Sequence, residues 1–481
     1  MNAQVRRLFW VVLAMFLALG CALTLIQVVQ ASSLFEDPRN TRRLYRSAET
    51  DRGPIVVEGT PIAYSERPED SQIYNRLYPE GPLYAGLTGY FSAMNFQATG
   101  IENAEDQVLT GEGTALFWQR TKDMFAGQTR RGGGVGLTIN PVVQKAAASG
   151  IGDRTGAAVA LDVKTGAVLA MYSSPSFDPT PLASNSTDVA EKAETELEND
   201  PGRPLENRAI AGNTYPPGSV FKIITTIAML ENGTQPDTVL DSPVSMTLPN
   251  TSTQLFNIDQ VPCGSGKVTL TEAFARSCNT TFALASEKMA ANQLSTVASR
   301  FGFGEPLSIP LNVTPSSVPE EMDKAQLALS SIGQYDVKVT PLQMAMIAQA
   351  IGNGGEMMKP YLVGQILDAA NQVQSETKPS SMGKPVSSTV ARDLTGMMKA
   401  VVDEPYGTGQ SMALAGVSVA AKTGTAEAGD FTNAWAVAFA PADDPKIAVA
   451  VVVEGDESDP YPHGGDVAGP IVRSMLEGGL G

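Results

Sequence analysis

Three groups of residues could together turn a serine into a nucleophile. Ser219 stands three positions before Lys222, Ser277 opens a Ser-Cys-Asn triplet that ends at Asn279, and Lys422 opens a Lys-Thr-Gly-Thr run. A serine hydroxyl is a poor nucleophile until a neighbouring base takes its proton. A lysine amine becomes such a base where burial and nearby positive charge lower its pKa. The residue types and their order therefore indicate acyl transfer through a covalent serine intermediate.

Ser219 is expected at the start of a helix. It follows a Pro-Pro-Gly segment and precedes an apolar run over residues 220–230, which ends at Glu-Asn-Gly. Proline before a helix start and glycine after its end are the usual signals. Lys222 then lies one turn after Ser219, so that its amine can reach the hydroxyl. The sole histidine, His463, lies in a loop-like stretch and is not expected to act as the base.

Two of the motifs occur more than once, and their surroundings separate the copies. Further Ser-x-x-Lys groups begin at Ser375 and Ser381, within the polar stretch 371–388, where a flexible loop could not hold an amine against a hydroxyl. A second Lys-Thr-Gly begins at Lys164 between two short apolar runs and predicts a hairpin turn. Lys422 instead stands between strand-like segments and comes third in order. The other copies are therefore not expected to take part.

The three motifs, in this order, resemble the signature set of penicillin-binding proteins and class A β-lactamases. Further segments extend the resemblance through most of the chain and make it similar to class B penicillin-binding proteins, in particular to the actinobacterial penicillin-binding protein A type. These segments are Asp37-Pro38-Arg39-Asn40, Arg52-Gly53-Pro54-Ile55, Thr88-Gly89-Tyr90-Phe91-Ser92, Asn207-Arg208-Ala209-Ile210, Ser331-Ile332-Gly333-Gln334, Thr340-Pro341 and the run from Lys422 to Glu427.

The resemblance implies a serine-type D,D-transpeptidase that cross-links peptidoglycan for cell wall growth or division. A stem peptide ending in D-Ala-D-Ala would acylate Ser219, the last D-alanine would leave, and an amine from a neighbouring stem would resolve the acyl-enzyme. Penicillins would acylate the same serine and inhibit the enzyme. No cofactor is expected, and the sequence shows no spacing typical of zinc ligands or of a phosphate loop.

Chemistry and resemblance together assign the roles within the site. Lys222 is the base, Lys422 supplies charge that lowers its pKa, and Ser277 passes the proton to or from the amine. Asn279 would hold the peptide backbone of the substrate. The backbone N–H groups of Ser219 and Thr425 would stabilise the oxyanion. The free carboxylate of the substrate would bind to the third motif, which consists of Lys422, Thr423, Gly424 and Thr425.

The apolar segments predict an α/β architecture. Residues 135–481 are expected to form a penicillin-binding, β-lactamase-like transpeptidase domain, with one central sheet covered by helices on both faces. Residues 30–134 are rich in Arg, Glu, Pro and Gly, and the resemblance makes them a mixed, extended and non-catalytic pedestal, similar to a dimerisation domain, that offers surface to proteins of cell elongation or division. The boundary is placed at residues 130–134, where glycines would give flexibility.

The N-terminus predicts a single membrane anchor. Residues 8–29 form an apolar run that can span a bilayer, and Arg6 and Arg7 precede it without any acid. The positive-inside rule then places residues 1–7 in the cytoplasm and the catalytic domain outside. A cleaved signal peptide, with a small-residue site near Ala31, is the competing interpretation, but the apolar run is longer than a typical signal core.

The net charge of −17 disfavours nucleic acid as a partner. Acidic residues gather in the stretch 188–200. This stretch is interpreted as a solvated loop or helix face, with a specific partner contact as the less favoured alternative.

Cys263 and Cys278 are candidates for a disulfide. They flank a helical segment at residues 270–275, and an extracytoplasmic setting permits their oxidation. Two small buried thiols are the alternative. Cys278 is not a candidate nucleophile, because no base is indicated beside it. Cys21 falls inside the apolar N-terminal run and is interpreted as an ordinary membrane residue.

Two other classes of function stay open. On the same scaffold, water in place of an amine would give a D,D-carboxypeptidase or a β-lactamase. A class A β-lactamase needs a positioned glutamate for deacylation, and the sequence does not identify one. A non-enzymatic divisome scaffold or β-lactam sensor would not need the motif residues, all of which are intact. The transpeptidase is therefore favoured.

Overall fold

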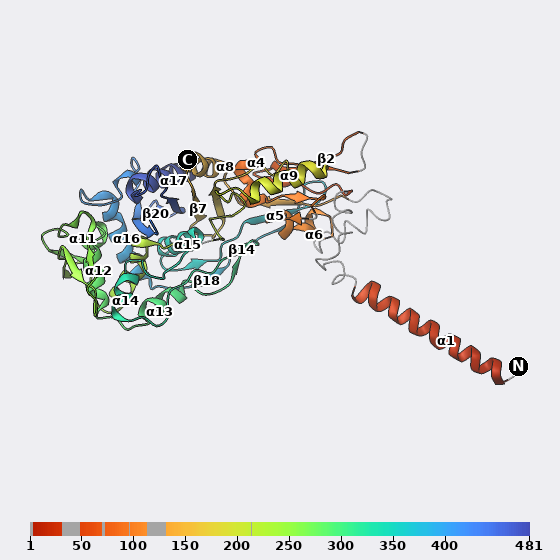
Figure 1. Cartoon of the computed structure of the whole chain (residues 1–481), viewed down its shortest axis with the longest axis horizontal. Helices are drawn as coiled ribbons and strands as arrows, with labels where there is room; N and C mark the ends of the chain where they lie inside the picture. Colours follow the sequence, from red (N-terminus) through yellow and green to blue (C-terminus); the bar gives the residue numbers. More distant parts are fainter. Residues whose placement is uncertain (1–2, 31–48, 70–72, 96, 113–130, 213) are drawn as a thin grey trace.

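The computed structural model describes residues 3–30, 49–69, 73–95, 97–112, 131–212 and 214–481. The described parts follow one another along the long axis, from an N-terminal helix through a smaller unit to a larger unit that holds the C-terminus (Figure 1). The segment Asp37 to Asn40, the proposed cleavage region at Ala31, and Arg130 lie outside the described residues.

An apolar helix begins the described chain. It comprises α1, Ala3–Thr24, and a π-helical continuation η1, Leu25–Val29. The segment Gln4–Gln27 has a mean hydropathy of 2.5 and is not buried against the protein. Among the described residues it is the one helix long and apolar enough to cross a bilayer. The helix starts before the predicted residue 8 because glutamine and arginine also favour helix.

The smaller unit, the pedestal, contains a six-stranded sheet built from two distant parts of the chain. Its strands are β1 (Ile55–Val57), β2 (Thr60–Glu66), β3 (Asn75–Leu77), β6 (Gly134–Leu137), β16 (Val363–Leu367) and β17 (Val373–Glu376). They are ordered β17-β16-β6-β1-β2-β3, with β1 parallel to β6. The strands β16 and β17, and all of β6 except Gly134, come from within residues 135–481 and complete the sheet of the pedestal.

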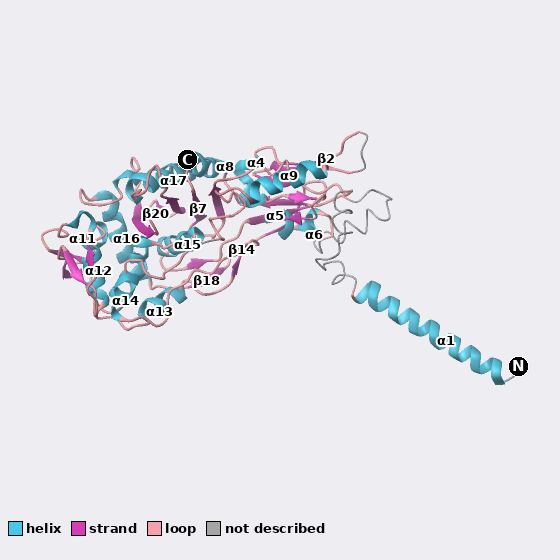
Figure 2. Cartoon of the chain, viewed as in Figure 1, coloured by secondary structure: helices cyan, strands magenta, loops and turns pink. Residues whose placement is uncertain are grey.

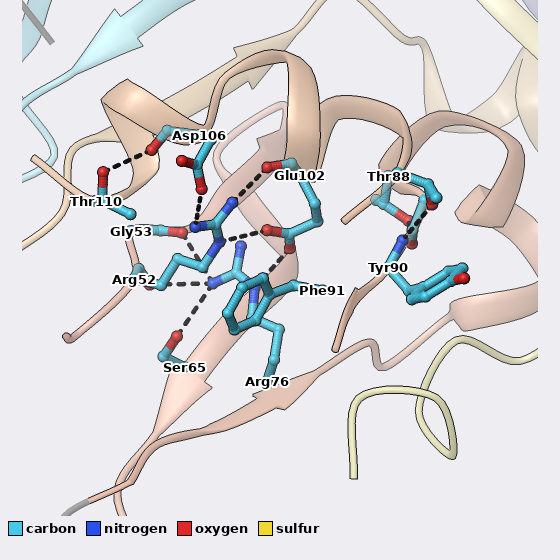
Figure 3. A network of polar contacts seen from close by, with 12 residues as sticks. Arg52, Gly53, Ser65, Arg76, Thr88, Tyr90, Phe91, Glu102, Asp106 and Thr110 are labelled. Carbon is cyan, nitrogen blue, oxygen red and sulfur yellow. Dashed lines mark hydrogen bonds and ion pairs between the residues drawn. The ribbon is translucent and has the colours of Figure 1, made fainter. Parts of the chain in front are cut away.

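Two arginines and two acids are buried together in the pedestal (Figure 3). Arg52 donates from Nε to Glu102 and from Nη1 to Asp106, both at 2.6 Å. Arg76 donates from Nε to the other carboxylate oxygen of Glu102, also at 2.6 Å. The Phe91 ring lies 4.6 Å from the Arg52 guanidinium. Around this network lie α4 (Gly81–Thr88), β4 (Phe91–Ser92), β5 (Gln97–Ala98), α5 (Gly100–Ala104) and α6 (Asp106–Leu109).

The glycines that were expected to make the boundary flexible are held in place where the structure describes them. Gly132 and Gly133 are buried, and both donate their N–H groups to backbone carbonyls. A Cβ on Gly132 would lie 1.9 Å from the carbonyl oxygen of Leu109. The glycines therefore permit close approach of two backbones, and β6 follows them directly as a strand of the pedestal sheet.

The larger unit is built on a five-stranded sheet. Its strands are β7 (Gly156–Asp162), β8 (Val168–Ser174), β19 (Ala420–Ala428), β20 (Phe431–Ala440) and β21 (Ile447–Glu454). They are ordered β19-β20-β21-β7-β8, and every neighbouring pair is antiparallel. A hairpin from the start of this unit thus pairs with three strands from its end.

Helices cover both faces of this sheet, as predicted. Trp435, Val437 and Phe439 of β20 belong to one core, together with α15, Pro341–Gly352. The alternate alanines of β20, at 434, 436 and 438, belong to a second core with α8 (Pro141–Ile151) and α17 (Gly469–Leu480). This alternation is that of a strand with two buried faces, and it confirms the predicted α/β architecture.

A largely helical region lies between β8 and β19. Besides α15, its α-helices are α9 (Thr187–Glu198), α10 (Lys222–Glu231), α11 (Leu270–Ala275), α12 (Asn279–Ser286), α13 (Gln293–Arg300), α14 (Lys324–Ser330) and α16 (Ser388–Asp403). Its short paired strands are β9 (Val239–Asp241) with β12 (Lys267–Thr269), β10 (Ser245–Thr247) with β11 (Gln254–Phe256), β13 (Leu307–Ser308) with β14 (Asn312–Val313), and β15 (Met357–Met358) with β18 (Ser381–Gly383). Helices α11 and α12 lie at the end of the molecule opposite α1 (Figure 2).

Of the two polar stretches, one contains strands that were not predicted, and the other forms a solvated helix face as predicted. Residues 371–388, predicted as a flexible loop, contain the strands β17 and β18; both are exposed throughout and so lack the apolar alternation that marks a half-buried strand. The acidic stretch forms α9, in which only Ala190 is buried, as expected of a solvated helix face. Its Glu194 accepts hydrogen bonds from Asn95 and Gln97 and so connects α9 to the pedestal.

Candidate active site

Ser219 lies at the entry to a helix, as predicted, although its own turn is a 3-10 turn. This turn, η3 (Gly218–Phe221), leads directly into α10, whose first residue is Lys222. Gly218 has a φ of 53°, a conformation that favours glycine. Ser219 keeps 8% of its surface exposed, whereas Lys222 is fully buried. The turn therefore leaves the hydroxyl accessible and takes the amine into the interior.

The amine of Lys222 is surrounded by oxygen atoms of the second motif. Its Nζ donates to the backbone oxygen of Ser277 at 2.7 Å and to Oδ1 of Asn279 at 2.8 Å, and it lies 3.3 Å from Ser277 Oγ. Burial lowers the pKa of Lys222 well below its ordinary value, and the charge of Lys422 lowers it further.

The lowered pKa of Lys222 favours its neutral amine. The Ser277 carbonyl and the Asn279 amide oxygen can only accept, and a neutral amine has two N–H groups to give them. The lone pair of Lys222 then stays available for a proton from a hydroxyl. That availability is what a general base requires.

Lys422 is a second buried amine, located on β19. Its Nζ donates to Ser277 Oγ at 2.9 Å and to the backbone oxygen of Thr423 at 2.8 Å. Burial lowers the pKa of Lys422 to about 7. Near neutral pH a positive charge is therefore present here for part of the time, and it opposes protonation of Lys222.

Ser277 connects the two amines from the junction of α11 and α12. Its φ of 60° lies in the left-handed region, which residues other than glycine rarely adopt and which is found at functional sites. The next residue, Cys278, forms a disulfide with Cys263, and their Cα atoms are 5.9 Å apart. The disulfide ties the loop before β12 (Lys267–Thr269) to the residue that follows Ser277.

Both ends of the Asn279 amide are engaged. Its oxygen accepts from Lys222, and its nitrogen donates to the backbone oxygen of Phe256, at the end of β11, at 3.1 Å. The predicted role of Asn279 is to hold the substrate backbone. An amide nitrogen carries two N–H groups, so one of them can bind the substrate while the other stays with the Phe256 carbonyl.

A cleft of about 780 Å³ brings the three motifs together. The motif residues on its wall are Ser219, Ser277, Asn279, Thr423, Gly424 and Thr425. The side chains of Thr408 and Thr423 hydrogen-bond to each other at this wall. Lys222 and Lys422 are not among the lining residues, since both are fully buried.

Several other lining residues were not expected from the sequence. Phe256, Thr408 and His463 come from loops or element ends without a recognisable pattern. His463 directly precedes the π-helical turn η6 (Gly464–Ala468), in which a Cβ on Gly464 would lie 2.3 Å from the backbone oxygen of Gly424. Three further lining residues, Ile332, Gln334 and Glu427, did carry a signal, because they belong to segments on which the family resemblance rests.

One expected contact is not formed. Among the described residues, no hydrogen bond joins Ser219 Oγ to Lys222 Nζ; the hydroxyl to which that amine donates is Ser277 Oγ. Catalytic hydrogen bonds are often loose in a free enzyme and tighten when substrate binds.

The other motif copies lie away from the cleft. Lys164 is exposed in the turn between β7 and β8. Ser375 and Ser381 are exposed on β17 and β18. The amine of Lys384 donates to Ser388 rather than to Ser381. In the described structure, none of these residues lines the wall that holds Ser219.

Two family models match the chain. Residues 156–477 match the penicillin binding protein transpeptidase domain, and residues 52–135 match the penicillin binding protein A dimerisation domain. The first model spans the five-stranded sheet and all three motifs.

Relatives and solved structures are similar over nearly the full chain. The peptidoglycan D,D-transpeptidase PbpA of Mycolicibacterium smegmatis is 42% identical over 100% of this chain and 99% of its own, and that of Mycobacterium tuberculosis is 41% identical over the same shares. A structure of M. tuberculosis penicillin-binding protein A as a ceftriaxone acyl-enzyme is 40% identical, covers 91% of this chain and 100% of that chain, and has a TM-score of 0.86. A structure of the same protein as a penicillin G acyl-enzyme is 41% identical. It covers 90% of this chain and 100% of that chain, with a TM-score of 0.83. This chain belongs to the penicillin-binding protein family that carries the transpeptidase domain.

Proposed function

We propose that this chain is a peptidoglycan D,D-transpeptidase in which Ser219 is the nucleophile and Lys222 its base. The observation that carries the proposal is the buried Lys222 amine, one turn from Ser219, with a lowered pKa and two pure acceptors for its N–H groups. Two relatives of similar length bear the D,D-transpeptidase name, and a relative of known structure forms acyl-enzymes with β-lactams.

Acylation begins when Lys222 takes the proton from Ser219 as its Oγ attacks the carbonyl carbon of the penultimate D-alanine. The N–H groups of Ser219 and Thr425 stabilise the negative charge that develops on the carbonyl oxygen. The C–N bond to the last D-alanine then breaks, and Lys222 returns the proton to the leaving amine through Ser277. An amine from a second stem peptide attacks the resulting ester by the same steps in reverse.

The carboxylate of the last D-alanine binds at β19. Thr423 and Thr425 line the cleft and offer hydroxyl groups, while the charge of Lys422 lies buried behind them. A bound carboxylate favours the charged form of Lys422. Substrate binding therefore strengthens the positive charge beside Lys222 and helps to keep that amine neutral.

The proposed location is the cytoplasmic membrane, with α1 as a retained anchor. Arg6 and Arg7 at its start support a cytoplasmic N-terminus and a catalytic unit outside the cell. The pedestal, residues 30–134, is the proposed docking part for proteins of cell elongation or division.

The test is a cross-linking assay with the full chain in detergent micelles. One stem peptide ends in D-Ala-D-Ala, and a second stem peptide supplies the amine. We expect one D-alanine released for each dimer formed, no product with Ser219→Ala, and inhibition by penicillin. D-Alanine release without dimers would identify a carboxypeptidase instead, and no release at all would reject the enzymatic function.

A further inference from the structure

The segment before the nucleophile lacks backbone N–H groups that could fix its position. Pro216 and Pro217 come just before the turn of Ser219, and a proline has no backbone N–H to donate. Before them, Tyr215 exchanges two backbone hydrogen bonds with Val339, of 2.9 and 2.8 Å. Between this anchor and the turn, the position of the two prolines depends on groups from other elements.

Trp435 supplies one such group. Its indole N–H donates to the carbonyl oxygen of Pro216 at 3.1 Å, and its side chain is fully buried. On β20, Trp435 pairs directly with Gly424 of β19, the glycine of the third motif. One rigid side chain therefore connects the segment before Ser219 to the strand that we propose binds the substrate carboxylate.

Tyr215 supports the indole from the side. The two rings meet edge to face, with centroids 6.0 Å apart and planes at 82°. The hydroxyl of Tyr215 donates to Glu454 Oε1 at 2.6 Å, and Arg208 donates to the same oxygen at 3.3 Å. Burial raises the pKa of Tyr215, and the Glu454 carboxylate raises it further, so the phenol keeps its proton and remains a donor.

The proline segment and the third motif are packed without spare space. A Cβ on Gly424 would lie 3.1 Å from the carbonyl oxygen of Pro217, and a Cβ on Gly218 would lie 2.6 Å from that of Thr425. A shift of the prolines would therefore move Ser219 relative to Thr425. A misplacement of about 1 Å at a reacting group can cost about 100-fold in rate.

We propose that Trp435, Tyr215 and Glu454 are positioning residues for the nucleophile. None of them lines the cleft, so their effect passes through the carbonyl of Pro216 and the backbone that follows it. They fix the position of Ser219 relative to β19. This inference rests on the proposed acylation of Ser219.

Tyr215→Phe and Trp435→Phe test it, because each removes one donor and keeps an aromatic ring. The full-length variants, in detergent, react with a range of concentrations of a fluorescent penicillin, which separates the limiting acylation rate constant from the half-saturating concentration. We expect the limiting rate constant to fall about tenfold or more, with about the wild-type half-saturating concentration. Glu454→Gln keeps an acceptor oxygen for Tyr215 and should retain most of the rate.

Tyr78→Phe is the matched control. Tyr78 is buried in the pedestal and also donates its hydroxyl to a glutamate, Glu102, at 3.2 Å. It should acylate at the wild-type rate, and thermal unfolding should show every variant folded at the assay temperature. If Trp435→Phe is unfolded, Tyr215→Phe decides alone.

The inference is overturned if Tyr215→Phe and Trp435→Phe both keep the wild-type limiting rate constant, or if only their half-saturating concentration changes. It is also overturned if the rate constant of Tyr78→Phe falls as much as theirs. A wild-type protein that penicillin does not acylate would overturn the proposed function instead.

Discussion

The hydroxyl of Ser277 is the point where the two lysines of the site meet. Its Oγ lies 2.9 Å from Nζ of Lys422 and 3.3 Å from Nζ of Lys222. Two ammonium groups on one oxygen repel each other, so one amine gives up its proton more readily. Burial and the neighbouring charge both act on Lys222, and this amine can therefore serve as a base without a histidine.

Replacing Lys422 should change the pH dependence of acylation. Lys422→Met removes a positive charge that lowers the pKa of Lys222, so the pKa of Lys222 rises and less neutral amine is present at a given pH. The acidic limb of the limiting acylation rate constant should move to higher pH. Rapid-mixing kinetics with penicillin between about pH 5 and 9 measure this shift. An unmoved limb would show that Lys422 does not act on the base.

Removing the base should abolish most of the acylation. Lys222→Ala should lower the acylation rate constant by about 10²–10⁴-fold, the usual contribution of a general base. Lys384→Ala, which changes the lysine of an exposed Ser-x-x-Lys copy, serves as the control and should keep the wild-type rate. A normal rate in Lys222→Ala would remove this residue from the mechanism, and a loss in Lys384→Ala would mean that the wrong copy was assigned.

At the scale of elements, the patterned segments were predictable. The helix after Ser219 is an apolar run with clear boundaries. Lys422 was expected between two strand-like segments, whereas it lies within β19, whose sequence is not an apolar run. The strands β17 and β18 are exposed on both sides and show no such pattern. Pairing of β16 with β6 joins segments far apart in sequence and depends on tertiary contacts that no local pattern encodes.

The residues of the site also fall into those that the sequence predicts and those that it does not. The contacts of Lys222 with Ser277 and Asn279 follow from motifs that must assemble for chemistry. Thr408 and His463 reach the cleft only because their loops fold back against β19 and η6. Loops of this kind carry no periodic signal, so the sequence could not place them.

The turn of the nucleophile should be sensitive to a single added methyl group. In Gly218→Ala the new Cβ would lie 2.6 Å from the carbonyl oxygen of Thr425, at a φ of 53°. Either the turn or β19 has to move, so we expect acylation by penicillin to fall about tenfold or more.

Gly233→Ala is the matched change near the other end of α10. Gly233 has a φ of 90° but nothing within 4 Å of its added Cβ. It should cost about 1–2 kcal/mol of backbone strain and leave acylation unchanged. Equal acylation rates in the two variants would mean that the close approach of Gly218 to Thr425 does not position the nucleophile.

At the scale of the whole molecule, the pedestal buries a charge network among its apolar core residues. Glu102 accepts from Arg52 and Arg76 and is fully buried. Burial raises the pKa of Glu102, but Arg76 and Arg52 together lower it below its ordinary value. This carboxylate therefore stabilises the folded state above its unfolded pKa of about 4.3, and the contribution is lost as pH falls through the lower folded pKa.

Glu102→Gln should destabilise the protein by about 3–5 kcal/mol, because it leaves two buried guanidinium groups without their shared carboxylate charge. Denaturant unfolding followed by circular dichroism measures the loss. Glu80→Gln breaks an exposed ion pair with Lys145 and should cost about 0–1 kcal/mol. Similar losses in both variants would contradict a structural role for the network.

The central claim is that Ser219 forms a covalent acyl-enzyme. The most direct measurement is the intact mass of the full chain in detergent after incubation with penicillin, beside Ser219→Ala. We expect one adduct on the wild-type protein that persists for hours, and none on the variant. An adduct on Ser219→Ala, no adduct on either protein, or an adduct that hydrolyses within minutes would contradict the account, and the last result would identify a β-lactamase.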